Sequence, residues 1–169
     1  MRLSGVISGR IPLFLCLCAA AQDRPELTGA WQMDLSRSES AHQATPIGPV
    51  TLIITQNADG FTIETRKVNA RKSSSREKLT YKLDGSAIST ADASGGEIKA
   101  KAHWDGPKLV TETARNIQGS TVTTMSVFSL DAGGNELTVH KSLTVQHGYQ
   151  FEGAATTGTA KDIFTRVKK

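Results

Sequence analysis

Polar and apolar residues alternate along most of this chain between residues 50 and 146, and short turn signals interrupt the alternation. These signals are five pairs that contain glycine: Asp59-Gly60, Asp84-Gly85, Asp105-Gly106, Gln118-Gly119 and Gly133-Gly134. Such pairs tolerate the positive φ angles that tight hairpins need. Because the alternation has the two-residue period of strands and not the period of helices, it predicts an antiparallel meander.

The alternation predicts strands at residues 27–35, 50–56, 61–68, 78–83, 87–90, 97–104, 108–116, 121–130, 136–146 and 161–167. Residues 78–83 and 87–90 are expected to pair across Asp84-Gly85. Residues 36–49 form a long connection or lid, and residues 71–76 an exposed basic turn. No segment predicts a helix of ten residues or more. Because closure removes exposed edges, we predict an all-β fold, an up-and-down antiparallel meander closed into a barrel of about 8–10 strands.

The N-terminus has the pattern of a secretory signal peptide, with Arg2 and Arg10 before an apolar run that ends in small residues. Cleavage is expected just before Gln22, since the run is too short for a comfortable membrane span. A buried N-terminal helix is the alternative. The signal peptide at residues 1–21 leaves one domain at residues 22–169, secreted or periplasmic and without stable membrane insertion. Cys16 and Cys18 leave with the signal, so the mature domain cannot form an internal disulfide.

Removal of the signal lowers the net charge of the chain, because 18 basic and 16 acidic residues remain. The net charge of the mature domain is therefore +2. Such a mild balance gives no reason to expect a nucleic-acid partner.

Two positions resemble the lipocalin (calycin) family. Gly29-Ala30-Trp31 lies on the first expected strand and Arg166 on the last. The resemblance implies that the basic residue of the final strand packs over the tryptophan and closes the bottom of the barrel. A guanidinium over an indole ring contributes about 0.5–2 kcal/mol. Gly29 would let the backbone pass close to that ring.

A longer stretch is similar to a group of secreted bacterial lipocalin-like proteins, which carry a G-x-W-x-x-D/N-x-x-x-S start and a W-D-G-x-K-L hairpin. The matching positions are Gly29, Trp31, Asp34, Ser38, Trp104, Asp105, Gly106, Lys108 and Leu109. The resemblance implies a fold and a location, and it brings no activity with it.

Candidates for metal binding and catalysis are weak. The histidines His42, His103, His140 and His147 do not converge in the pattern, so we interpret them as solvated side chains. No G-x-S-x-G motif is present, and an S-x-x-K match at residues 75–78 lies in the basic turn instead of a helix. Glu112 and Asp162 lie far apart in the sequence. We expect no metal, no cofactor and no enzymatic activity.

A ligand cavity has better support. Ala100, Ala102, Thr111 and Thr113 are small residues on strand faces shared with Ile98, Trp104, Leu109 and Arg115. Small inward side chains would leave room that leucine or isoleucine would fill. Lys141 shares a face with four apolar residues, so it either meets an anionic head group, lies near the barrel mouth or is shifted outward by a bulge. The candidate ligand-binding residues are Trp104, Thr111, Thr113, Arg115 and Lys141.

The sequence therefore predicts a secreted, non-enzymatic, lipocalin-like protein that binds a small hydrophobic or anionic amphipathic ligand, with a fatty-acid carboxylate near Lys141 or Arg115. The alternative is an envelope interaction module with a solidly packed barrel whose outer face or lid binds another protein. An enzyme is the third possibility.

Overall fold

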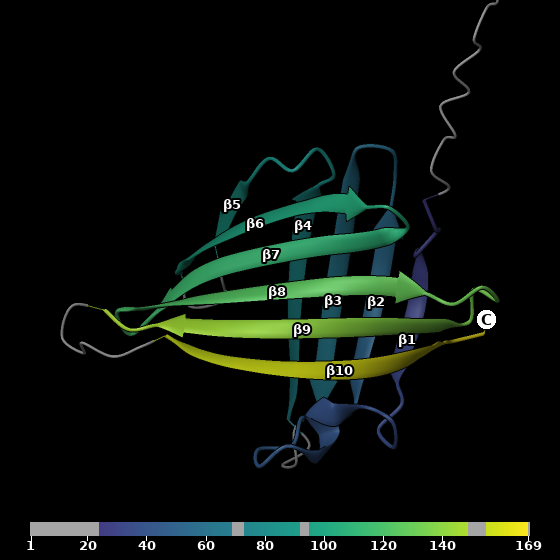
Figure 1. Ribbon diagram of the computed structural model, residues 1–169, viewed down its shortest axis with the longest axis horizontal. Helices are drawn as coiled ribbons and strands as arrows, with labels where there is room; N and C mark the ends of the chain where they lie inside the picture. The colour runs from purple at the N-terminus through teal and green to yellow at the C-terminus, as the bar shows by residue number, and fades with distance from the viewer. Residues whose placement is uncertain (1–23, 69–72, 92–94, 149–154, 169) are drawn as a thin grey trace, which may run out of the picture.

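The computed structural model describes residues 24–68, 73–91, 95–148 and 155–168. These residues form ten strands in one antiparallel sheet and one short 3-10 turn (Figure 1). The strands are β1 (Gly29–Met33), β2 (Val50–Gln56), β3 (Gly60–Val68), β4 (Ser74–Lys82), β5 (Ile88–Ala91), β6 (Glu97–Asp105), β7 (Lys108–Ile117), β8 (Ser120–Leu130), β9 (Glu136–Gln146) and β10 (Thr156–Arg166). The 3-10 turn η1 (Glu39–His42) lies between β1 and β2. The expected signal peptide lies outside the described residues.

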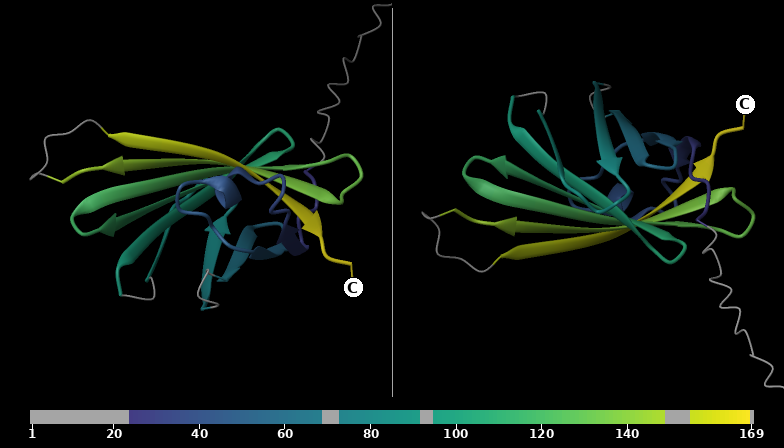
Figure 2. Two further views of the ribbon diagram at one scale, coloured as in Figure 1. Left: turned by 90° about the horizontal axis from the view of Figure 1, so that it is seen from below. Right: turned by 90° about the horizontal axis from the view of Figure 1, so that it is seen from above.

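The sheet follows chain order except where β1 pairs with β10, which brings the first and last strands together. The order is β4-β3-β2-β1-β10-β9-β8-β7-β6-β5. In Figure 1, β6 to β10 cross in front of β1 to β4, and Figure 2 shows the two halves as separate layers. The structure confirms the predicted all-β, up-and-down meander, as a nearly closed barrel with ten strands.

The predicted hairpin across Asp84-Gly85 is wrong, because β4 and β5 do not pair and form the two ends of the sheet. Gly85 does adopt a turn conformation, with a φ of 83°. Its amide, however, donates to the carbonyl of Ala102 on β6, at 3.0 Å. The small side chains of Ala100 and Ala102, both buried, let β4 lie close to β6. At this turn the chain therefore passes from β4, at one end of the sheet, to β5, at the other end, and the two strands do not form a hairpin.

The predicted basic turn also ends earlier than expected, since Ser74 to Arg76 belong to β4. Residues 71 and 72 lie outside the described residues. Arg76 pairs with Glu64 on the neighbouring strand β3, with 2.9 Å between Nε and Oε1. This cross-strand ion pair lets the arginine extend the strand with its side chain on the outer face.

A packed core fills one end of the barrel. Trp31, Phe61 and Phe164 are fully buried in it. Phe61 on β3 meets Phe128 on β8 edge to face across the interior, with 6.0 Å between the ring centroids. Edge-to-face aromatic pairs stabilise a core beyond the area that they bury. The Phe61–Phe128 pair therefore ties the two halves of the barrel together.

The connection from residue 34 to residue 49 covers an edge that β1 leaves open. Strand β1 is shorter than β10, so part of β10 has no neighbouring strand on that side. The amide of Asp34 donates to the carbonyl of Ile163 at 2.8 Å, and the amide of Ile163 donates to Ser38 Oγ at 3.0 Å. The amide of Lys161 donates to Glu39 Oε2 at 2.8 Å. The backbone and side chains of the connection thus satisfy backbone groups of β10 that a longer β1 would otherwise bind.

Candidate functional site: the barrel interior

Trp31 and Arg166 pack together at the filled end of the barrel. Trp31 is fully buried, and its Nε1 donates to the carbonyl of Leu27 at 2.9 Å. The Arg166 guanidinium carbon lies 4.1 Å from the centre of the indole ring. Gly29 has a φ of 146°, and a Cβ atom there would lie 2.7 Å from Arg166 Nη1. The stacking expected from the sequence is therefore present, and Gly29 leaves the space that it needs.

Arg166 also joins the N-terminal segment to the β8–β9 turn. Its Nε donates to the carbonyl of Gly134, and its Nη1 donates to the carbonyl of Thr28, both at 2.7 Å. A third bond runs from Nη2 to the carbonyl of Glu26 at 3.3 Å. These charge-assisted bonds close this end of the barrel and position its entering and leaving segments.

A cavity of about 370 Å³ lies inside the barrel beyond the Phe61–Phe128 pair. Its apolar wall comes from inward positions of the strands and includes Val50, Leu52, Ile63, Leu79, Phe128 and Val139. Phe128 both lines the cavity and packs on Phe61, so this pair separates the cavity from the filled core. Ile47 of the connection lines it as well. The polar part of its lining includes Thr113, Arg115 and Lys141.

Three of the five candidate ligand-binding residues, Thr113, Arg115 and Lys141, thus line one cavity. The alternation along β7 and β9 brings them together, because every second residue of each strand faces the interior. The other two candidates, Thr111 and Trp104, do not line it.

Thr111 and Trp104 belong to packed regions. Thr111 is buried and forms a hydrogen bond with the Tyr81 hydroxyl. Burial raises the pKa of Tyr81 to about 12, so this phenol is neutral at physiological pH. Trp104 lies beside the β6–β7 turn and packs against the core, with the Arg24 guanidinium 6.0 Å from its ring centre. Ala100 and Ala102 also lie in the core, so the room that they leave is taken by packing across the barrel.

Lys141 has a partner that the sequence did not indicate. Its ammonium donates to Asp162 Oδ2 at 2.7 Å, and the Asp162 carboxylate is fully buried. Ser40 donates its amide to Oδ1 at 3.0 Å and its hydroxyl to Oδ2 at 2.8 Å. Burial by itself raises the pKa of Asp162, but the Lys141 ammonium and the Ser40 bonds outweigh it and lower that pKa below 3.8. The charge of Lys141 is therefore neutralised.

Arg115 also has a partner, on the far side of the sheet opening. Its Nη1 lies 2.9 Å from Glu77 Oε1. Arg115 is on β7 and Glu77 on β4, and these two strands are not neighbours in the sheet. This ion pair therefore links the two sides of the barrel through side chains alone.

Lys67 is the third cation that lines the cavity, and the sequence analysis missed it. No carboxylate among the described residues forms an ion pair with it. Lys67 is exposed overall, at the end of β3. Partial desolvation beside the neighbouring strands lowers the pKa of Lys67, and the charges of Lys141 and Arg115 lower it further, while Glu77 raises it. The alternation along β3 does indicate this position, because Lys67 shares the inward parity of Phe61 and Ile63.

The other acidic candidate, Glu112, lies away from Asp162. It faces outward on β7 and pairs with Lys101, with 3.0 Å between Nζ and Oε1. Within the described residues, no group of three or more His, Cys, Asp or Glu side chains is placed to hold a metal ion. In the same part of the chain, no helix has the length and apolar character needed to cross a membrane.

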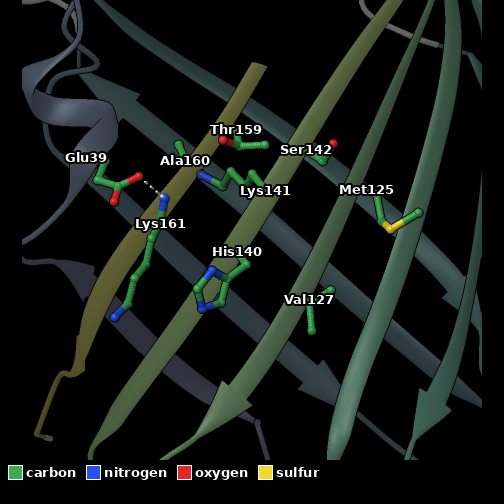
Figure 3. Close-up of a pocket in the computed structure, with 9 residues that line it drawn as sticks. All are labelled: Glu39, Met125, Val127, His140, Lys141, Ser142, Thr159, Ala160 and Lys161. Carbon is green, nitrogen blue, oxygen red and sulfur yellow. Dashed lines mark hydrogen bonds between the residues drawn. The ribbon is translucent and has the colours of Figure 1, made fainter. Parts of the chain in front are cut away.

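A second hollow, of about 390 Å³, lies across β8, β9 and β10 (Figure 3). Met125 and Val127 supply its apolar part, and His140 and Lys161 its basic part. Figure 3 shows that Lys141 extends toward β10, away from His140. This hollow lies on the outer face, because Met125 and His140 occupy the exposed positions of their strands.

No protein family model and no curated protein sequence matches this chain. Solved structures match over most of it. A fatty acid transporter termed REP1-NXSQ is 16% identical, with a TM-score of 0.51 over 85% of this chain and 97% of its own. Secretory abundant heat soluble protein 4 from Ramazzottius varieornatus is 13% identical, with a TM-score of 0.53 over 84% and 95% of the two chains.

Apo lipid binding protein 8 from Caenorhabditis elegans is 12% identical, with a TM-score of 0.50 over 83% of this chain and 94% of its own. At such identities the similarity concerns the fold. The chain has the lipocalin-like, calycin-type β-barrel fold that the G-x-W start and Arg166 resemble.

Proposed function

We propose that this protein is a non-enzymatic binding protein that holds a small hydrophobic or amphipathic molecule inside its barrel. The interior cavity carries this proposal, because it combines an apolar wall with three cations. A volume of about 370 Å³ lies in the range of small-molecule sites, about 300–1,000 Å³. Burial of an apolar chain supplies most of the affinity, and the cations orient the ligand.

The fold neighbours support the same function. The descriptions of two of them name a fatty acid transporter and a lipid binding protein. This chain has the same architecture and an interior that packing leaves partly open. The alternative, an interaction module with a solidly packed barrel, agrees less well with this partly open interior. The outer hollow beside Met125 would nevertheless give such a module a surface for a protein partner.

A fluorescent fatty acid, 11-(dansylamino)undecanoic acid, tests the proposal. We expect saturable binding to the mature protein with an increase in dansyl emission. Ser126 lines the cavity from β8, so Ser126→Trp should fill it and weaken binding at least about tenfold, or 1.4 kcal/mol. Met125→Trp places the same bulk on the outer face and should leave binding unchanged. Absence of saturable binding to the wild type would reject the proposal.

Native mass spectrometry of protein purified from its source separates the two alternatives. A co-purifying small molecule supports the binding protein. A clean apo mass, together with co-purification of an envelope protein that Met125→Trp abolishes, supports the interaction module.

We also propose that the protein is exported and acts outside the cytoplasm. Arg2, Arg10 and the apolar run that follows them support this location. N-terminal sequencing of the mature protein should begin at or near Gln22. Intact Met1 on protein recovered from the cell envelope would contradict it.

A further inference from the structure

The side of the barrel between β4 and β5 holds a hollow that joins the interior. Strands β4 and β5 are the two ends of the sheet, so no strand hydrogen bonds close this side. The hollow measures about 380 Å³ and takes residues from β3, β4, β5, β6 and β7. It shares five lining residues with the interior cavity: Thr65, Lys67, Glu77, Leu79 and Arg115. The interior thus reaches the surface here.

The charges at this opening are not balanced. The Arg115–Glu77 ion pair spans it, with 2.9 Å between Nη1 and Oε1. Lys141 lines the interior behind it, but its charge is taken up by Asp162. Arg76 and Lys78 also line this hollow, and Arg76 pairs with Glu64. Within the described residues, neither Lys67 nor Lys78 forms an ion pair, so the lining has an excess of positive charge. Of these two lysines, only Lys67 also lines the interior cavity.

The surroundings of Lys67 make an anion a better complement than water. Lys67 faces the cations Arg115 and Lys141 and the single acid Glu77. Lys67 is exposed overall. Partial desolvation of its ammonium and the two like charges disfavour the charged form and lower its pKa. A ligand carboxylate placed between Lys67 and Arg115 would reverse this imbalance and form charge-assisted hydrogen bonds with both.

We propose that the opening between β4 and β5 is an anion subsite, in which the carboxylate of an amphipathic monoanion binds Lys67 and Arg115. The apolar part of the ligand extends from there through the interior cavity toward Phe128. This inference rests on the proposed function and narrows it to a ligand class, an acid and not a neutral lipid. It makes Lys67 the residue that determines specificity for the charged head group.

Two probes with the same chain and different head groups test the subsite. These are 11-(dansylamino)undecanoic acid, ionised at pH 7.5, and its uncharged methyl ester, each titrated into the mature wild-type protein and four variants. We expect the wild type to bind the acid about tenfold more tightly than the ester, because only the carboxylate forms charge-assisted hydrogen bonds with Lys67 and Arg115. Lys67→Gln should lose this preference and keep its affinity for the ester.

Three further variants make the result specific. Lys67→Arg keeps the charge and should keep the preference for the acid. Arg115→Gln should reduce the preference as Lys67→Gln does. Lys99→Gln removes a lysine from an outward position of β6 and should behave as the wild type.

Equal affinity of the wild type for acid and ester would overturn the subsite and leave interior binding in place. A Lys67→Gln variant that keeps the full preference for the acid would also overturn the subsite. Binding of neither probe would overturn both the subsite and the proposed function.

Discussion

Lys141 and Asp162 form an ion pair in which the carboxylate is fully buried and the lysine remains partly exposed, with 2.7 Å between Nζ and Oδ2. Asp162 also accepts two hydrogen bonds from Ser40 in η1. This carboxylate therefore fixes the lysine in the barrel wall and holds the connection between β1 and β2 against β10. Loss of either contact leaves a buried polar group without its ion-pair or hydrogen-bond partner.

Asp162→Asn should lower the free energy of unfolding by about 3 kcal/mol, because breaking a buried ion pair leaves the other groups uncompensated. Chemical denaturation of the apo protein measures it. Glu112→Gln is the matched control, since it removes a carboxylate from a pair on the outer face. That variant should change stability by no more than about 0.5 kcal/mol. Equal effects of the two substitutions would contradict the anchoring role of Asp162.

The same carboxylate should make stability depend on acid pH. The pKa of Asp162 in the folded protein lies below its ordinary value of 3.8, so the charged form favours folding. Its contribution is fully present above 3.8 and is lost as the pH falls through the lowered pKa. The stability difference between the wild type and Asp162→Asn should therefore be constant near neutrality and narrow below pH 3.8. Thermal unfolding across this range measures it, and a constant difference would contradict the assignment.

Trp31 and Arg166 should be energetically coupled. Trp31→Ala removes a fully buried aromatic ring and should lower the free energy of unfolding by about 3–5 kcal/mol. Arg166→Ala should lower it by about 0.5–2 kcal/mol, through lost stacking and stem packing. The double variant should then lose less than the sum of the two. Strict additivity would show that the stacking contributes nothing to closure of the barrel.

The sequence predicted well those features that local chemistry determines. Four of the five glycine-containing turns join neighbouring strands, and Gly29, Trp31 and Arg166 meet as the lipocalin resemblance implies. Two further positions of that pattern, Asp34 and Ser38, proved structural. Asp34 accepts hydrogen bonds from Ser36 and Arg37, which lower its pKa to about 2, and Ser38 binds Ile163 on β10.

The features that the sequence did not predict depend on pairing between distant strands. Asp84-Gly85 has hairpin chemistry, but the partner of its amide is Ala102 on another strand. The parity of Lys141 left an inward and an outward position open, and in the structure the residue lines the cavity. Its neutralisation by Asp162 depends on the β9–β10 register, which sequence alternation does not specify. The alternation along residues 61–68 also gives Lys67 inward parity, but Lys67 was not among the candidate ligand-binding residues.

Lys67 should destabilise the empty protein. The pKa of Lys67 in the folded protein lies below 10.5, because partial desolvation and the charges of Lys141 and Arg115 disfavour its ammonium form. Solvent screens part of this effect, since the side chain is exposed. Lys67→Gln should therefore raise the Tm of the apo protein at pH 7. The difference should shrink as the pH rises through the lowered pKa toward 10.5, because the wild-type lysine then loses its proton in the fold.

A bound carboxylate should reverse this effect, since an anion compensates the charge that destabilises the apo state. Saturating 11-(dansylamino)undecanoic acid should raise the Tm of the wild type more than that of Lys67→Gln. Differential scanning fluorimetry, read through intrinsic tryptophan emission, measures both shifts. Lys99→Gln should show the wild-type response throughout. If the apo Lys67→Gln protein has a lower Tm than the apo wild type, Lys67 stabilises the fold. That result would contradict the prediction that its charge destabilises the empty protein.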